Sequence, residues 1–332
     1  FMKKTLFLVL SMLFTLCVFA QDRDVDFVRG GASHSANLPM FGFETVRKAP
    51  AKLGMPIHGY MPVSKQAVPM KAGDGTTLFG EVVYSTKMDT PESPITWGLY
   101  SFPATAGTVF TEKLIHNTIC ANGGGAYRKG KLHFVSYYEG YEPGSLMYLY
   151  FCTLDVNTLT LEKKALPGNE FTSIGLDMTY DPVGDMLYMQ AYPSNAATAP
   201  DPIYTLSTMN IETGKSTPIA DMDRMSMIVC DISGNMYGVR YKDGMFCKID
   251  KSNARVTEVG STGVNPQYNG SATFDYKTCK LYWSTCERMT GKSGIYEIDI
   301  TTGKATLISL YPNNEQVTCL YIPQDDEICQ LG

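Results

Sequence analysis

The chain has 332 residues, of which 44% are hydrophobic and 18% are charged, a composition typical of a globular protein with an ordinary core. The formal net charge is −5 and no basic run occurs, which argues against nucleic acid or an anionic membrane surface as a partner. Past residue 20 no apolar stretch is long enough to cross a bilayer, so we expect no membrane insertion.

Residues 2–20 have the pattern of a signal peptide. Lys3 and Lys4 precede an apolar stretch from Thr5 to Phe19, and Ala20 supplies the small residue that a cleavage site needs. Phe1 stands ahead of Met2 and takes no part in this segment. The pattern predicts export, to the periplasm, the cell surface or the extracellular space.

Residues 21–75 contain scattered prolines, glycines and lysines and no periodic pattern, which predicts an irregular, extended leader segment. Outside the signal peptide the chain has eight cysteines. An exported chain with an even number of cysteines can form disulfides, but burial as small apolar side chains is the simpler interpretation. Cys230 with Cys247 is the better candidate for a bridge, and Cys279 with Cys286, at the two ends of one predicted strand, is the poorer one.

A tight hairpin recurs along the chain. Residues 299–306 (DITTGKAT) match residues 210–217 (NIETGKST), and residues 250–257 and 155–160 are weaker copies. Residues 103–108 form a fifth copy, in which Gly107 stands where the two stronger copies have Gly214 and Gly303. Asp or Asn at the start can accept hydrogen bonds from the following turn, and Gly takes the positive φ that reverses the chain. We therefore expect these Asp and Asn residues to form turns.

A second pattern precedes each hairpin: a strand, a polar turn opened by Asp, and a strand that begins with an apolar–Tyr pair, as in residues 179–188 and 273–282. The two patterns alternate, so each unit holds four strands over about 40 to 55 residues, the period of a propeller blade. Units two to five are expected at about 119–166, 173–220, 225–260 and 269–310. The first unit lacks its inner strand, and the strand at 317–323 can supply it and close the ring.

The sequence thus predicts an all-β, five-bladed β-propeller over residues 76–323, with a short tail at 324–332. An open solenoid of hairpins is the main structural alternative. Nothing in the sequence indicates an oligomeric state.

Recurrent phrases of this repeat carry a family resemblance, at residues 121–127, 177–182, 260–264, 271–275 and 307–315. They resemble the N-terminal β-propeller modules of secreted multidomain surface proteins of Bacteroidota. The resemblance covers about residues 76–323 and implies the fold and a surface context. It implies no activity for any particular residue.

In a propeller, the connections from the fourth strand of one blade to the first strand of the next share a face with the turns between second and third strands. We call this the loop face and expect ligands there. Tyr residues close the second strand of successive blades near its rim, and amides fill its loops, along with Arg224 and Arg288. Tyr faces and amides suit sugar rings. The predicted ligand-binding residues are Tyr137, Tyr192, Tyr241, Asn122, Asp177, Asn269 and Asn313.

These observations predict a non-catalytic binding module that presents its loop face to a glycan or a glycoprotein. A protein–protein scaffold of a surface complex is the first alternative. A glycoside hydrolase-like enzyme with channel carboxylates is the second, although no inward trio of acids follows the repeat. The four histidines lack metal-ligand spacing, and we expect neither a metal nor a cofactor. The glycine run at 123–125 is expected to allow close backbone packing at the channel.

Overall fold

The computed structural model describes residues 73–86, 98–115, 120–137, 149–166, 175–191, 204–267 and 270–324. The predicted signal peptide, nearly all of the predicted leader and the tail beyond Gln324 lie outside these residues. Within them the chain forms strands, turns and loops and no α-helix. The described residues accordingly contain no helix that could cross a membrane.

In the part of the chain that the structure describes, twenty strands form five antiparallel sheets of four. Blade 1 contains β1 (Thr77–Tyr84), β2 (Gly98–Pro103), β3 (Thr111–Ile115) and β20 (Gln316–Tyr321). Blade 2 contains β4 (Cys120–Arg128), β5 (Lys131–Tyr137), β6 (Leu149–Asp155) and β7 (Thr160–Ala165). Blade 3 contains β8 (Gly175–Asp181), β9 (Met186–Ala191), β10 (Tyr204–Met209) and β11 (Ser216–Met222). Blade 4 contains β12 (Met225–Cys230), β13 (Met236–Arg240), β14 (Met245–Ile249) and β15 (Val256–Ser261). Blade 5 contains β16 (Ser271–Asp275), β17 (Lys280–Glu287), β18 (Lys292–Ile298) and β19 (Ala305–Leu310).

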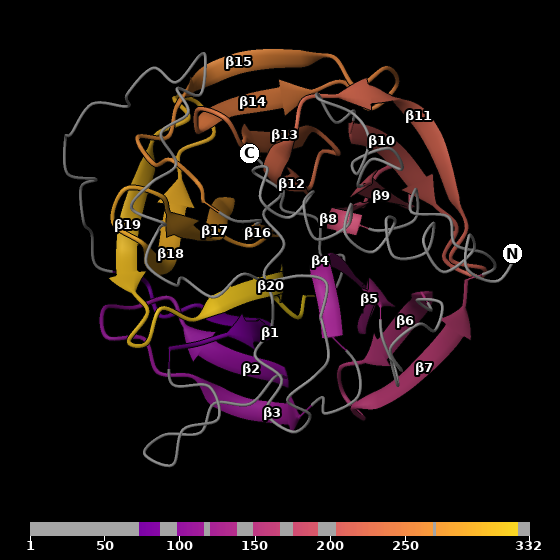
Figure 1. Ribbon diagram of the computed structural model, residues 1–332, viewed down its shortest axis with the longest axis horizontal. Helices are drawn as coiled ribbons and strands as arrows, with labels where there is room; N and C mark the ends of the chain where they lie inside the picture. Colours follow the sequence, from indigo (N-terminus) through magenta and orange to yellow (C-terminus); the bar gives the residue numbers. More distant parts are fainter. Residues whose placement is uncertain are drawn as a thin grey trace, which may run out of the picture.

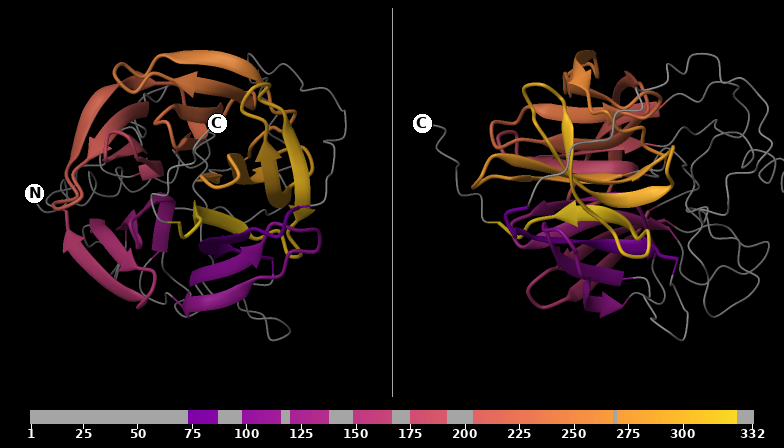
Figure 2. Two further views of the ribbon diagram at one scale, coloured as in Figure 1. Left: turned by 180° about the vertical axis from the view of Figure 1, so that it is seen from behind. Right: turned by 90° about the vertical axis from the view of Figure 1, so that its left-hand side faces the viewer.

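The sheets stand around a common axis, with β4, β8, β12, β16 and β20 innermost and β3, β7, β11, β15 and β19 at the rim (Figure 1). Seen from behind, the same ring of blades is apparent, and seen from the side the blades form a thick disc (Figure 2). The prediction of a five-bladed β-propeller is confirmed, and the predicted units two to five match blades 2 to 5 to within a few residues at each end.

The ring closes through β20, which comes last in the described chain and pairs antiparallel with β1, with Glu81 opposite Thr318 and Phe79 opposite Tyr321. This is the closing strand predicted at 317–323, and it rules out the open solenoid. Closure also brings Tyr321 into the seam between blades 1 and 2, where its ring stacks on Phe79 and Tyr127, both at 5.4 Å between ring centroids.

The core lies between neighbouring blades rather than in one central mass. Its apolar clusters join successive blades around the ring. Every residue of the inner strands β8 and β12 is buried, whereas the rim strand β7 is exposed along most of its length. Inner strands are covered on both sheet faces, so they carry near-continuous rather than alternating apolar residues.

The hairpin turns are built as the sequence predicts. Asn210 Oδ1 accepts hydrogen bonds from the amides of Glu212 (3.0 Å) and Thr213 (2.8 Å), and Gly214 follows with φ 71°. Asp155, Asp250 and Asp299 accept from their own turns in the same way. These side chains are therefore turn formers, as expected.

Two glycines at the same hairpin position differ in their surroundings, which yields a prediction. Gly107 (φ 73°) has nothing within 4 Å of where a Cβ would lie, whereas a Cβ on Gly214 would lie 2.3 Å from Phe151 Cβ in blade 2. Gly107→Ala should lower the free energy of unfolding only by the strain of a left-handed backbone, about 1–2 kcal/mol. Gly214→Ala should cost about 1–3 kcal/mol more, because blades 2 and 3 must also move apart. Urea unfolding of both variants measures the difference, and equal losses would contradict it.

No disulfide joins any two of the six cysteines whose side chains the structure describes, which are Cys152, Cys230, Cys247, Cys279, Cys286 and Cys319. The suggested bridge between Cys230 and Cys247 is wrong. Cys230 lies on β12 opposite Met236, and Cys247 lies on β14 opposite Gly238. One strand separates them, and two strand spacings are about 9–10 Å, beyond the roughly 7 Å that a disulfide can span between Cα atoms.

Candidate functional site

Most of the loop face where blades 4 and 5 meet lies within the described residues. Residues 223–224 lead into β12, residues 262–267 and Gly270 belong to the connection before β16, and the turns after β13 and β17 are hydrogen-bonded to these connections. Of the predicted ligand-binding residues, Tyr241, Asp177 and Asn313 have described side chains. Tyr137 and Asn122 are described only as strand residues of β5 and β4, and Tyr192 and Asn269 lie outside the described residues.

Tyr241, directly after β13, has two arginines close to its ring. The guanidinium carbon of Arg224 lies 3.8 Å from the centre of the Tyr241 ring, and that of Arg288 lies 4.8 Å from it. Arg224 also lies over Tyr204, at 5.7 Å. All three of Arg224, Tyr241 and Arg288 are half-buried. We call these three residues the arginine–tyrosine stack.

Backbone hydrogen bonds hold the stack in place. The Tyr241 amide donates to the Arg224 carbonyl (2.9 Å), and the Tyr241 hydroxyl donates to the Gln267 carbonyl (2.6 Å). The Arg288 amide donates to the Asn265 carbonyl (2.7 Å), and its guanidinium donates to the Pro266 carbonyl through Nε (3.3 Å) and Nη2 (3.1 Å). Three separate connections are thus joined into one rigid patch.

Gln190 supports the patch from blade 3. Its side chain is fully buried, its Nε2 donates to the Asp223 carbonyl (3.0 Å), and its Oε1 accepts from the Met225 amide (3.2 Å). These two bonds fix both ends of the short connection that carries Arg224. Gln190 is not among the residues predicted from the sequence, and a polar residue near the end of the apolar strand β9 is the signal that could have indicated it.

Within the described residues, the acidic residues closest in sequence to Tyr241 and Arg288 are bound by other groups. Arg240 donates to Asp243 Oδ2 (2.6 Å) and Glu258 Oε1 (2.6 Å), and these hydrogen bonds raise its pKa. The Glu287 carboxylate accepts from the amides of Met289 (2.9 Å) and Thr290 (2.7 Å). The stack therefore adjoins a set of neutralised or turn-bound acids.

Asn313 is tied into its own loop. Its amide nitrogen and side-chain nitrogen donate to the Glu315 carboxylate, both at 2.9 Å, and its carbonyl accepts from the Thr86 amide at 2.8 Å. Its binding role stays a prediction, and its structural role is to join the connection before β20 to the end of β1.

Asp177 lies inside the ring, partway along the inner strand β8. Its side chain is buried, and Oδ2 accepts from the Ile228 amide of β12 at 2.7 Å. Burial raises the pKa of this carboxyl well above its usual value, and the hydrogen bonds from the Ile228 and Met178 amides and the Ser271 hydroxyl only partly oppose the effect. Asp177 is therefore buried among the inner strands, and its role in ligand binding stays a prediction.

The glycine run fits around this side chain. A Cβ on Gly124 would lie 1.7 Å from Asp177 Oδ1, and one on Gly125 would lie 3.0 Å from Cys319 Sγ. Only glycine allows β4 to approach its neighbours this closely, so the prediction of close backbone packing at the channel is confirmed.

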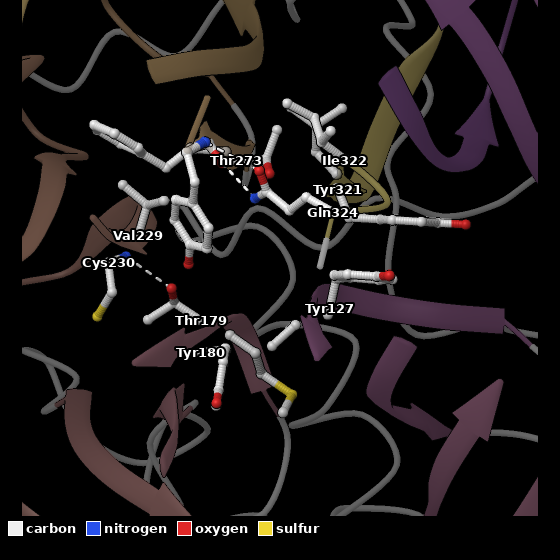
Figure 3. Close-up of a pocket in the computed structure, with 16 residues that line it drawn as sticks. Tyr127, Thr179, Tyr180, Val229, Cys230, Thr273, Tyr321, Ile322 and Gln324 are labelled. Carbon is white, nitrogen blue, oxygen red and sulfur yellow. Dashed lines mark hydrogen bonds between the residues drawn. The ribbon is translucent and has the colours of Figure 1, made fainter. Parts of the chain in front are cut away.

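A cavity lies at the opposite end of the channel, away from the loop face. It is lined by the last residues of all five inner strands, among them Tyr127, Thr179, Cys230, Thr273 and Tyr321 (Figure 3). Gln324 crosses beside it, with Nε2 donating to the Phe274 carbonyl (2.8 Å) and Oε1 accepting from the Tyr276 amide (3.0 Å). The sequence predicts ligands on the loop face and contains no sign of this cavity.

The cavity measures about 40 Å³, whereas one buried water needs roughly 10–15 Å³ and a small-molecule site usually has about 300 Å³ or more. It can hold a few waters but no sugar ring. Burial raises the pKa of the Cys230 thiol on its wall, which disfavours the thiolate that a nucleophile requires.

Three buried carboxyl groups bear on the enzyme alternative. Asp177 lies on the inner strand β8, Glu81 lies on β1, and Glu315 lies in the connection before β20, where it accepts a hydrogen bond from Asn313. Catalysis of glycoside hydrolysis needs two carboxyl groups that flank an accessible bond, and these three are closed off from solvent. Among the described residues no group of three or more His, Cys, Asp or Glu side chains could hold a metal ion.

No protein-family model and no curated protein matches the chain. Among solved structures it is similar to a chain of a nidogen/laminin complex, with 8% identity and a TM-score of 0.44 over 74% of this chain and 97% of that one. A putative gluconolactonase gives 12% identity and a TM-score of 0.41, over 75% and 83% of the two chains. An exo-β-1,3-galactanase from Clostridium thermocellum gives 11% and 0.40, over 63% and 66%. Similarity at this level carries no inference about what this chain binds or does.

Proposed function

We propose that the protein is a non-catalytic binding propeller of the exported or cell-surface class, which recognises a glycan through its loop face. The observation that carries the proposal is the arginine–tyrosine stack, where side chains from separate connections meet in a half-buried, rigid patch. A patch that is already ordered loses little conformational entropy when a ligand binds. The buried acids Asp177, Glu81 and Glu315, by contrast, are closed off from solvent.

The scattered positions of the exposed apolar residues favour a glycan over a protein partner. Within the described residues the exposed large apolar side chains are Val109, Val183, Met186, Met289 and Leu310. They lie in three different connections and at two strand ends, of blades 1, 3 and 5, and so form no broad patch. The core of a protein interface is usually a contiguous apolar area, and planar aromatic and polar groups suit sugars.

Binding to a broad glycan and polysaccharide array tests the proposal, with the purified protein compared with Tyr241→Ala. We expect specific binding that falls by about tenfold or more in the variant, because both arginines lose the ring that positions them. Tyr188→Ala is the matched control: Tyr188 is also half-buried with a cation nearby, Lys251 at 5.9 Å, but lies near the other face. Absence of glycan binding by the folded protein would leave the protein scaffold as the better function.

A further inference from the structure

His133 lies on β5, where blade 2 packs against blade 3. It shares a face of its sheet with Ala126, Val135 and Phe151, and these three belong to the apolar cluster that joins the two blades. His133 is 2% exposed, and its ring stacks on the Phe151 ring with 5.8 Å between centroids. A Cβ on Gly214 of blade 3 would lie only 2.3 Å from Phe151 Cβ. One side chain therefore separates His133 from blade 3.

The imidazole stands where the rest of the repeat has a carbon ring. The residues at the same position of the second strand in the other four blades are Phe79, Tyr188, Tyr237 and Tyr282. None of these side chains gains a charge in mild acid, whereas histidine does. Of the five blades, blade 2 thus has the only acid-responsive side chain at this position.

Only one ring nitrogen of His133 has a hydrogen-bond partner. Nδ1 lies 3.1 Å from Thr153 Oγ1, and Nε2 is buried without a partner. A neutral imidazole carries hydrogen on one nitrogen, but an imidazolium carries it on both. The charged ring would therefore hold a buried N–H on Nε2 with no acceptor, which is costly. Water has to reach Nε2 before the ring can keep a proton.

We infer that the seam between blades 2 and 3 is an acid-sensitive hinge, in which protonation of His133 separates these two blades while the seam between blades 4 and 5 stays closed.

The nearest charges oppose protonation in the closed seam. Burial lowers the pKa of His133 from 6.5 to about 4, and the positive charges of Arg128, Lys131 and Lys164 act in the same direction. These three residues come from β4, β5 and β7, so cations surround the ring from its own sheet.

The acids of the elements packed here are exposed or bound elsewhere. Asp185 accepts two hydrogen bonds from Arg128, both at 2.8 Å, and Asp155 accepts from the amides of its own turn. Glu162 on β7 and Glu212 in the blade 3 hairpin are exposed to solvent, as is Lys215 beside Glu212. No carboxylate among the described residues therefore holds a proton on His133 in the closed seam.

The sign of the pH dependence follows from these values. In the open seam the ring meets water and titrates near 6.5, whereas in the closed seam it titrates near 4. Between these two values the open form binds the proton and the closed form does not. The ratio of open to closed seam should therefore rise about tenfold for each pH unit of acidification in this range, and should be constant above it.

Hydroxyl-radical labelling read by mass spectrometry locates the opening. Phe151 and Met209 report on the seam between blades 2 and 3, and Phe246 and Trp283 report on the seam between blades 4 and 5. All four are at most 1% exposed. From about pH 7 to about pH 4.5 we expect labelling of the first pair to rise at least about threefold, and labelling of the second pair to stay constant.

Two variants remove the titrating group in different ways. His133→Phe keeps a ring on Phe151, and His133→Gln keeps a polar partner for Thr153. In both, labelling of Phe151 and Met209 should not change over this pH range. Urea unfolding at about pH 7, where the imidazole is neutral in both states, separates any loss of stability by the substitution itself from the effect of acid.

Three results would overturn the inference. The same rise in labelling in the wild type and in both variants would show that groups other than His133 respond to acid. A rise at all four reporter residues together would show that the whole propeller unfolds and that no single seam acts as a hinge. Constant labelling of the wild type down to about pH 4.5 would show that the seam stays closed whatever the charge of His133.

Discussion

Asp177→Asn should leave stability unchanged in acid and should make the protein progressively more stable than the wild type as pH rises. The carboxyl lies among the inner strands of the ring, where burial raises its pKa well above the usual 3.8. Below pH 3.8 the carboxyl is protonated in both the folded and unfolded states. Above it the unfolded chain releases the proton and the folded protein keeps it. The wild type therefore loses about 1.4 kcal/mol of stability per pH unit until the pKa of the folded state is reached.

Asparagine is the appropriate replacement because it is nearly isosteric with a protonated aspartic acid. Its Oδ1 can still accept from the Ile228 amide, and its amide never ionises. Urea unfolding of both proteins between pH 3.5 and pH 7, ~0.5 pH unit apart, measures the difference, in which titration of all other groups cancels.

Asp299→Asn provides a control of opposite sign. Hydrogen bonds from the Thr301 hydroxyl and amide lower the pKa of Asp299, so its carboxylate stabilises the fold above the unfolded pKa and that stability is lost as pH falls. As pH rises, the free energy of unfolding of the wild type should thus increase relative to that of Asp299→Asn. Relative to that of Asp177→Asn it should decrease. A difference for Asp177→Asn that does not change with pH would show that the buried carboxyl is ionised in the folded protein.

The same side chain shows where sequence reasoning reached its limit. Asp177 is the third residue of the inner strand β8, and the sequence alone predicted it as a ligand-binding residue of the loop face. Its direction depends on how five inner strands approach one another, and in particular on Gly124, whose missing side chain leaves the space that Asp177 occupies. A repeat pattern gives the period of the strands and not the distance between blades.

The fold was predictable because its signals are local and repeated. The hairpin at Asn210 and its copy at Asp299 follow from turn chemistry, and the unpaired strand at the end of the repeat indicated how the ring closes. The arginine–tyrosine stack was only partly predictable. Tyr241 was selected from its strand-end position, whereas its pairing with Arg224 and Arg288 depends on two neighbouring blades.

The cavity could not be predicted from any motif. Its lining consists of strand ends from every blade, such as Thr179 and Thr273, whose side chains are ordinary for strands. Gln324, which lies in the predicted tail, is bound to blade 5 only because β20 brings it there. Both features exist only once the ring has closed.

Ring closure accounts for the other large expected effect: Tyr321→Ala should lower the free energy of unfolding by about 3–5 kcal/mol, the usual cost of removing a buried aromatic side chain. Tyr321 is only 1% exposed and ends the closing strand. Its ring stacks on Tyr127 of blade 2 and Phe79 of blade 1. The truncation therefore loosens the strand that closes blade 1 and the seam between blades 1 and 2 at once.

Tyr321→Phe is the matched control, because it keeps the ring and both stacking contacts and should cost far less than the alanine variant. Urea unfolding followed by fluorescence, together with hydrogen exchange at the amides of β20 and β1, separates the two effects. In Tyr321→Ala we expect exchange to accelerate most in β20, because a closed ring opens first where its two ends meet. Equal stability of the alanine and phenylalanine variants would mean that blade 1 is held by the β1–β20 backbone pairing alone, and that the aromatic seam contributes little to closure.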